Sequence, residues 1–197
     1  MVKTKIAVLV SGGGTNLQAL LDAQQAGKIP HGEIALVISN KEGAYALTRA
    51  ANFGVKAQVI TGKDFETKLQ QALEENGIQM IVLAGFMKIL SGEFTSKWPD
   101  RILNIHPALI PSFCGEGYYG LRVHEEALRY GVKVTGATVH FVNEIPDGGE
   151  ILLQKAVEIL PGDTAEVLQR RVMEQAEWLL LPQAAEMVSA EIVKERA

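Results

Sequence analysis

The sequence is poor in cysteine, in long apolar runs and in positive charge. Its 197 residues include one cysteine, Cys114, which excludes an internal disulfide and a multi-cysteine zinc site. No apolar run approaches the ~20 residues that a membrane helix needs, and the N-terminus lacks the pattern of a secretory signal. Basic residues number 19 against 23 acidic ones, which disfavours nonspecific binding to nucleic acids. We therefore expect a cytoplasmic protein whose partners include neither a membrane nor a nucleic acid.

The residues that are present indicate a folded α/β protein. Hydrophobic residues make up 47% of the chain and charged residues 21%, which is typical of a soluble globular protein. Short apolar runs that suit buried strands recur at 6–10, 34–38, 56–60, 79–84 and 102–105. Segments with helical spacing of apolar residues separate these runs. The alternation predicts a Rossmann-like, doubly wound and mostly parallel sheet.

The second half of the chain has a different pattern. Residues 134–142 and 150–159 are β-rich and are separated by a Gly-containing turn, so we expect an antiparallel C-terminal extension of the sheet. Residues 164–194 have a helical pattern, in which Pro182 is expected to kink or split the helix. No linker or internal repeat interrupts the sequence. Residues 1–197 are therefore predicted to form a single domain.

A Gly-rich loop, residues 11–16, follows the first predicted strand and opens a helix. Its glycines permit close approach to a ligand, and the free N–H groups of the helix N-terminus favour an anion such as phosphate. A dinucleotide motif would need glycine at Leu17 and an acidic residue at the end of the second strand, where Ser39 and Asn40 stand. The sequence therefore predicts a monophosphate site, with a plain tight turn as the alternative.

A second group of polar residues surrounds the end of the fifth predicted strand. Asn104 and His106 are two residues apart, so in a strand they face the same side. An Asn amide can donate to an oxyanion, and a His can move a proton near neutral pH. Asp147, in the later Gly-containing turn, could hold the imidazolium. The three residues suit acyl-type transfer to a nucleophile supplied by the substrate, although each taken singly has an ordinary structural explanation.

Four segments together resemble one known family. They are SGGGTNLQ at 11–18, LAGFMKIL at 83–90, NIHPALIP at 104–111 and GATVHFV at 136–142, the last leading into Asp147-Gly148-Gly149. The chain resembles the phosphoribosylglycinamide formyltransferases along essentially its whole length. The Asn-x-His-Pro segment with its downstream Asp is shared by a wider formyltransferase superfamily, and the Gly-rich loop narrows the resemblance to the glycinamide ribonucleotide enzymes.

The resemblance implies formyl transfer from 10-formyltetrahydrofolate, as co-substrate, to the amino group of glycinamide ribonucleotide. His106 would be the general acid for the departing folate nitrogen, and Asn104 would stabilise the tetrahedral oxyanion. Asp147 would raise the pKa of His106 by favouring its charged form. No metal is implied. A monomer or a homodimer is expected.

The resemblance also implies binding residues for both substrates. For the ribonucleotide they are Gly13, Gly14, Thr15, Asn16, Met87, Pro107 and Glu177. For the folate they are Lys63, Met87, Lys88, Ile89, Leu90, Asn104, Val142, Asn143 and Asp147.

Some positions depart from the family pattern. Lys88 replaces the commoner Arg, and Lys63 is the nearest counterpart of an arginine expected near the folate tail. A long loop, residues 112–121, replaces a shorter segment, and we expect it either to close over the substrate or to be a benign insertion. His140 is interpreted as a satisfied structural histidine, and Cys114 as incidental rather than nucleophilic.

Two alternatives stay open. The first is another superfamily member, either a formyltetrahydrofolate hydrolase or a tRNA formyltransferase, each of which would carry an additional domain that we do not expect in this chain. The second is a noncatalytic phosphometabolite-binding protein on the same fold. That protein would keep residues 11–16 but would not need Asn104, His106 and Asp147 together.

Overall fold

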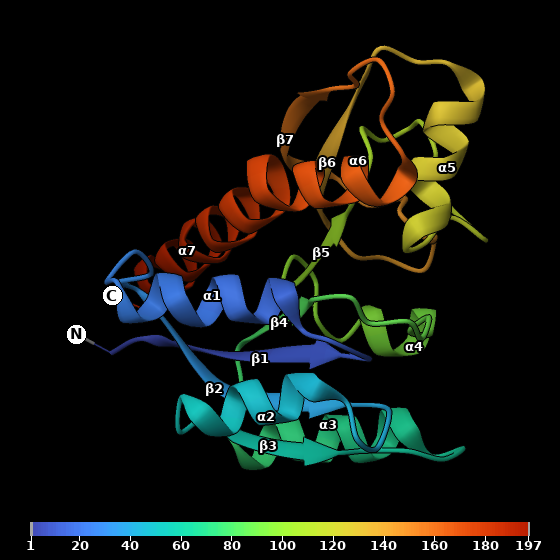
Figure 1. The fold of residues 1–197 in the computed structure, drawn as a ribbon. Helices are drawn as coiled ribbons and strands as arrows, with labels where there is room; N and C mark the ends of the chain where they lie inside the picture. Colours follow the sequence, from blue (N-terminus) through green and yellow to red (C-terminus); the bar gives the residue numbers. More distant parts are fainter. Residues whose placement is uncertain (1, 197) are drawn as a thin grey trace.

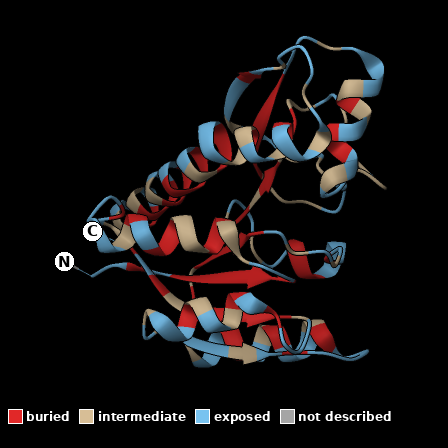
Figure 2. Cartoon of the chain, viewed as in Figure 1, coloured by how far each residue is buried: buried red, intermediate tan, exposed pale blue. Residues whose placement is uncertain are grey.

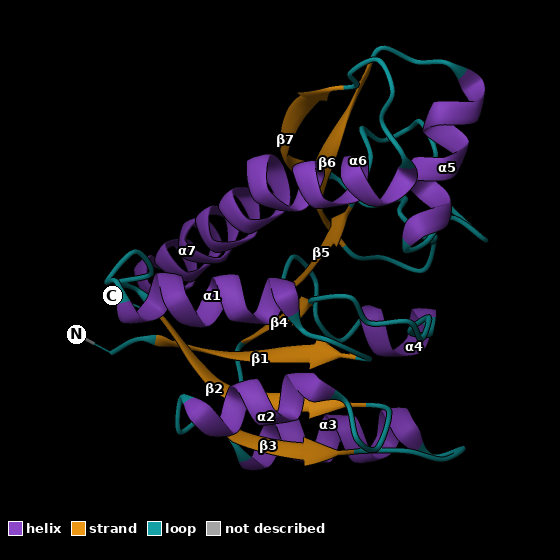
Figure 3. Ribbon diagram, viewed as in Figure 1, coloured by secondary structure: helices purple, strands orange, loops and turns teal. Residues whose placement is uncertain are grey.

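The computed structural model describes residues 2–196, so the two ends of the predicted domain, Met1 and Ala197, lie outside the described residues. One seven-stranded sheet with the strand order β3-β2-β1-β4-β5-β6-β7 forms the centre (Figures 1 and 3). The strands are β1 (Thr4–Val10), β2 (Gly32–Ser39), β3 (Lys56–Val59), β4 (Met80–Leu83), β5 (Ile102–His106), β6 (Val134–Phe141) and β7 (Ile151–Glu158). The helices are α1 (Thr15–Gln25), α2 (Tyr45–Asn52), α3 (Phe65–Glu75), α4 (Gly92–Thr95), α5 (Leu121–Tyr130), α6 (Ala165–Val172), a π-helical turn η1 (Met173–Glu177) and α7 (Trp178–Lys194).

The predicted fold class is confirmed. Strands β3, β2, β1, β4 and β5 pair in parallel, and β6 and β7 extend the sheet in antiparallel pairing. The central strand β1 is buried on both faces (Figure 2), as its continuous aliphatic run predicts. Ile6 and Val8 pack under α1, α6 and α7, whereas Ala7 and Leu9 pack on the opposite face with α3.

The register aligns the strand ends that later carry polar groups. Leu9 of β1 pairs with Leu83 of β4, Leu83 pairs with Asn104 of β5, and Asn104 pairs with His140 of β6. The Gly-rich loop, which begins just past β1, therefore leaves the same edge of the sheet as Asn104. The strand order also reverses at β1, which is where open α/β sheets bind ligands.

The C-terminal helical segment is interrupted at a different place from the predicted one. Pro182 lies inside α7 and does not split it. The interruption is η1, one turn upstream, where the Trp178 N–H donates to the Met173 carbonyl. A π-helical turn of this kind is frequent at functional sites, and this one carries Glu177.

Candidate active site

Three predicted residues meet at the ends of β5 and β6. Asn104 and His106 project from β5 toward Asp147, which lies in the turn after β6. The Nδ1 atom of His106 is 3.5 Å from Asp147 Oδ2, and Asn104 Nδ2 is 3.4 Å from Asp147 Oδ1. His106 is buried, and Asp147 has a left-handed backbone, with φ of 55°. The structure therefore brings together the three residues that the sequence grouped.

His140 is the residue of this cluster that the sequence did not assign to the site. Its Nδ1 lies 2.7 Å from the Phe141 carbonyl, which can only accept, so Nδ1 carries a proton. Its Nε2 lies 3.1 Å from Asn104 Nδ2 and 3.5 Å from Asp147 Oδ1. The side chain is buried and satisfied, as predicted, but its partners are Asn104 and Asp147. The antiparallel register that sets His140 opposite Asn104 is the signal that would have identified it.

The long loop lies within the site. The Phe113 carbonyl is 2.8 Å from His106 Nε2, so Nε2 donates a hydrogen bond to it. The Gly115 N–H donates to Asp147 Oδ2 at 2.9 Å. Two backbone groups of the loop thus contact His106 and Asp147, two of the ionisable side chains of the cluster.

Cys114, between these two loop residues, has the character of an ordinary thiol. Burial and the negative charge of Asp147 both raise its pKa, so the thiol keeps its proton at neutral pH. Its Sγ donates to the Pro111 carbonyl at 3.3 Å. This environment agrees with the interpretation of Cys114 as non-nucleophilic.

Burial dominates the protonation of His106. Desolvation lowers the pKa of His106, and the attraction of Asp147 and the hydrogen bond to Phe113 offset only part of that shift. Asp147 therefore raises this pKa, as the resemblance implies, but the larger opposing effect of burial was not predicted from the sequence. Burial would raise the pKa of Asp147, but its hydrogen bond with His140 and the charge of His106 outweigh burial and lower it. The cluster therefore holds a neutral imidazole beside an ionised carboxylate.

The Gly-rich loop connects the end of β1 to the start of α1. Gly14 precedes the helix with a left-handed φ of 73°, and a Cβ there would lie 2.6 Å from the Ala46 side chain, so glycine is required. The first N–H groups of α1, from Thr15 onward, have no partner within the helix. Asn16 Nδ2 donates to Glu177 Oε2 at 2.7 Å, which joins α1 to η1.

Glu177 is the ionisable side chain among the predicted ribonucleotide-binding residues, and its pKa is strongly shifted. Burial raises its pKa to about 7, and the hydrogen bond from Asn16 opposes this rise. In the unfolded chain the Glu177 carboxyl has its ordinary pKa of 4.5, so it loses its proton at a lower pH than in the folded protein. Unfolding therefore releases a proton between pH 4.5 and about 7, and this contribution to stability falls as the pH rises through that window.

Replacing Glu177 with glutamine is expected to stabilise the protein at high pH. The Glu177→Gln variant keeps an acceptor for Asn16 and removes a buried charge, so its free energy of unfolding should exceed that of the wild type by up to about 3 kcal/mol at pH 8. At pH 4 the two proteins should be equally stable. Urea unfolding at both pH values measures the difference, with exposed Glu174→Gln of the same turn as the control. If the difference in free energy of unfolding between Glu177→Gln and the wild type did not vary with pH, the raised pKa of Glu177 would be contradicted.

The structure brings only some of the predicted folate-binding residues close to the Gly-rich loop and the cluster. The Met87 N–H donates to Ser11 Oγ at 2.8 Å, which ties the loop after β4 to the Gly-rich loop. Met87 and Ile89 expose their side chains, whereas Leu90 is buried in the core and can offer only its backbone. The Lys88 ammonium lies 4.4 Å from the centre of the Phe65 ring.

The remaining predicted residues lie at the rim of the site. Val142 packs partly against the core, and Asn143 Oδ1 accepts from the Ile145 N–H within the turn that leads to Asp147. Pro107 directly follows β5. Lys63 is exposed before α3, and within residues 2–196 no hydrogen bond or ion pair joins it to the other predicted residues.

Residues 2–196 lack both a metal-ligand cluster and a membrane-spanning helix. That part of the chain contains no group of three or more His, Cys, Asp or Glu residues placed to hold a metal ion. It also contains no helix of sufficient length and hydrophobicity to cross a membrane.

Comparison with known proteins places this chain in one family. The model of the formyl transferase family matches residues 4–184. The phosphoribosylglycinamide formyltransferase of Haemophilus influenzae is 45% identical over 177 residues, which cover 87% of this chain and 81% of that protein. The glycinamide ribonucleotide transformylase 1 structure from Symbiobacterium toebii has a TM-score of 0.88 and 41% identity, covering 96% of this chain and 89% of that one. The chain therefore belongs to the formyl transferase family and, within it, to the phosphoribosylglycinamide formyltransferases.

Some relatives are much longer. The trifunctional purine biosynthetic protein adenosine-3 of Gallus gallus is 44% identical over 198 residues, which cover 98% of this chain but 19% of that protein. The chain thus spans about a fifth of the length of this relative.

Proposed function

We propose that the chain transfers a formyl group from 10-formyltetrahydrofolate to the amino group of glycinamide ribonucleotide. The observation that carries this proposal is the meeting of Asn104, His106 and Asp147 at the sheet edge from which the Gly-rich loop also leaves. Family membership and the grouping of these three side chains both support the proposal. These two small molecules are the only partners that the reaction requires.

The two substrates approach the cluster from different sides. The phosphate of the ribonucleotide binds at the N–H groups of Gly14, Thr15 and Asn16, and its ribose lies near Glu177. The folate lies along Met87–Leu90 and Val142–Asn143, so that its formyl group reaches Asn104. Lys63, which is exposed and free of ion pairs within residues 2–196, is available for the acidic folate tail.

Asn104 stabilises the oxyanion. The substrate amine attacks the formyl carbon, and the carbonyl oxygen gains negative charge. Asn104 Nδ2 has one contact of 3.1 Å to His140 and a longer one of 3.4 Å to Asp147. The longer contact is the weaker one, so the corresponding N–H can turn to the oxyanion.

His106 moves the proton. Because its pKa lies below the ordinary value of 6.5, it starts neutral and can accept the proton that the attacking amine releases. Asp147 stabilises the imidazolium that forms. The same proton then passes to the folate nitrogen as its bond to the formyl carbon breaks, so His106 ends neutral again.

A turnover assay with each substrate omitted in turn tests the proposal. Formyl transfer that requires both substrates is the expected result. Release of formate from the folate without the ribonucleotide would indicate a hydrolase instead. Saturable binding of the ribonucleotide without turnover would indicate a binding protein that retains the residues of the family.

A further inference from the structure

Helix α2 holds the Gly-rich loop by its carbonyl groups. The Ala46 N–H donates to the Gly12 carbonyl at 3.1 Å, and Arg49 Nε donates to the Gly13 carbonyl at 2.8 Å. In a planar trans peptide the C=O and the following N–H point in opposite directions. The N–H groups of Gly13 and Gly14 therefore point away from α2, toward the open side where an anion would bind.

The Gly-rich loop and α2 pack closely against each other at Gly14. Gly14 approaches Ala46 so closely that a Cβ would lie 2.9 Å from the Ala46 Cα and 3.5 Å from the Arg49 Cδ. Gly14 therefore packs directly against α2, with no room for a side chain between them. Arg49 lies at the one point where α2 both touches the loop and supplies a charge.

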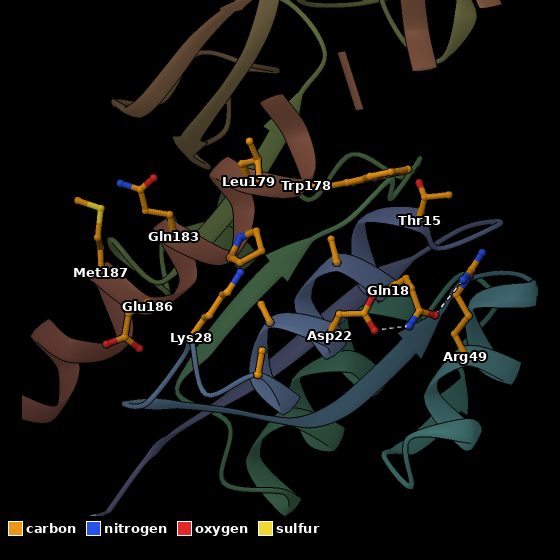
Figure 4. Close-up of a pocket in the computed structure, with 14 residues that line it drawn as sticks. Thr15, Gln18, Asp22, Lys28, Arg49, Trp178, Leu179, Gln183, Glu186 and Met187 are labelled. Carbon is orange, nitrogen blue, oxygen red and sulfur yellow. Dashed lines mark hydrogen bonds between the residues drawn. The ribbon is translucent and has the colours of Figure 1, made fainter. Parts of the chain in front are cut away.

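The guanidinium of Arg49 is fixed by three contacts. Besides Gly13, its Nη1 donates to Gln18 Oε1 at 2.8 Å, and its Cζ lies 5.0 Å from the centre of the Tyr45 ring. Gln18 is itself held by Asp22 at 2.8 Å. Figure 4 shows Arg49 and Gln18 beside Thr15, at one end of a groove of about 700 Å³ that runs between α1 and α7.

The guanidinium of Arg49 still has N–H donors that could bind an anion. Arginine carries five N–H donors, and within residues 2–196 the Nη2 group of Arg49 has no hydrogen-bond partner. No other Lys or Arg side chain in that part of the chain donates a hydrogen bond to residues 11–16. Arg49 is thus a preorganised, half-exposed cation beside a helix N-terminus.

We propose that Arg49 is the residue that makes the site specific for a phosphorylated substrate, by positioning the Gly-rich loop through Gly13 and by placing its charge beside the phosphate. The inference rests on the proposed function because that function identifies the anion as the phosphomonoester of the ribonucleotide. Arg49 acts in binding and not in formyl transfer.

The test compares phosphorylated and phosphate-free substrates. In the Arg49→Gln variant, the KM for the ribonucleotide should rise about 10- to 100-fold, the range for loss of a hydrogen bond to a charged group. The kcat value, the folate KM and the kcat/KM for the phosphate-free riboside should stay within about twofold. The Arg49→Lys variant keeps the positive charge but lacks the planar guanidinium. Its KM for the ribonucleotide should therefore lie between the values of the wild type and Arg49→Gln. Arg129→Gln on α5, an exposed site, is the charge-matched control.

A binding experiment separates this inference from the proposed function. Calorimetry with ribose 5-phosphate needs no formyl transfer, and the dissociation constant should rise in Arg49→Gln by the same factor as the KM. Absence of turnover together with this loss of affinity would refute the proposed function and keep the role of Arg49. Equal affinity in wild type and Arg49→Gln, no binding to the wild type, or an equal loss of activity with the riboside would overturn the inference. Thermal unfolding of each variant shows that a change in affinity does not reflect an unfolded protein.

Discussion

Replacing His106 with alanine is expected to lower kcat by about 10²- to 10⁴-fold, the usual contribution of a general acid–base group. In the proposed reaction, His106 takes the proton of the amine and returns it to the departing nitrogen, with Asp147 3.5 Å from its Nδ1 atom. The KM for the ribonucleotide should change little, because His106 makes no hydrogen bond to the Gly-rich loop. Steady-state kinetics with each substrate varied in turn measure both constants.

A second histidine provides the matched control for this variant. His31 lies just before β2, contacts Glu186 and has no contact with the cluster. The His31→Ala variant should retain the wild-type kcat. If His106→Ala also retained it, proton transfer through His106 would be refuted.

Replacing Asp147 with asparagine is expected to lower kcat by at least about 10²-fold. Asp147 Oδ1 faces His140 and Asn104, and Oδ2 faces His106 and the Gly115 N–H. The NH₂ group of an asparagine at this position must face either His140 and Asn104 or His106 and the Gly115 N–H. The substitution also removes the negative charge that stabilises the His106 imidazolium. The geometry and the charge of the cluster are therefore lost together, whereas the KM for the ribonucleotide should be retained.

The pH profile of Asp147→Asn gives a second and independent result. In the wild type Asp147 raises the pKa of His106 against the larger lowering by burial. Without that charge the pKa of His106 falls further, so neutral His106 persists to lower pH. The acid limb of kcat/KM should therefore move to lower pH while kcat falls. Exposed Glu144→Gln in the same turn is the control, and an unmoved acid limb would argue against the contact with His106.

Sequence patterns predicted the parts of the fold that depend on local composition. The aliphatic run from Ile6 to Val10 specifies a strand buried on both faces, and the two-residue spacing of Asn104 and His106 specifies a shared side. The Gly-rich loop is recognisable because its glycines and the helix start are adjacent in sequence. Each of these signals lies within a few residues of the structure that it specifies.

The features that the sequence missed depend on contacts between distant segments. His140 meets Asn104 through a register across 36 residues, and Arg49 reaches Gly13 across the same separation. Arg49 lies outside the four segments that carry the family resemblance, and His140 lies in one of them without a local signal for its partners. The lowering of the His106 pKa by burial was not predicted, because desolvation depends on packing density, which a residue pattern does not give.

The Phe113 carbonyl and the Gly115 N–H already form hydrogen bonds with His106 and Asp147, so a substrate that binds there as proposed must displace both backbone groups. A ligand that reaches both side chains must replace two internal hydrogen bonds, each with a net contribution of about 0.5–1.5 kcal/mol. The observed dissociation constant then exceeds the intrinsic one by roughly 5- to 150-fold. If the substrate binds as proposed, residues 112–121 compete with it for His106 and Asp147, and changes in that loop alter the apparent affinity without contacting the substrate.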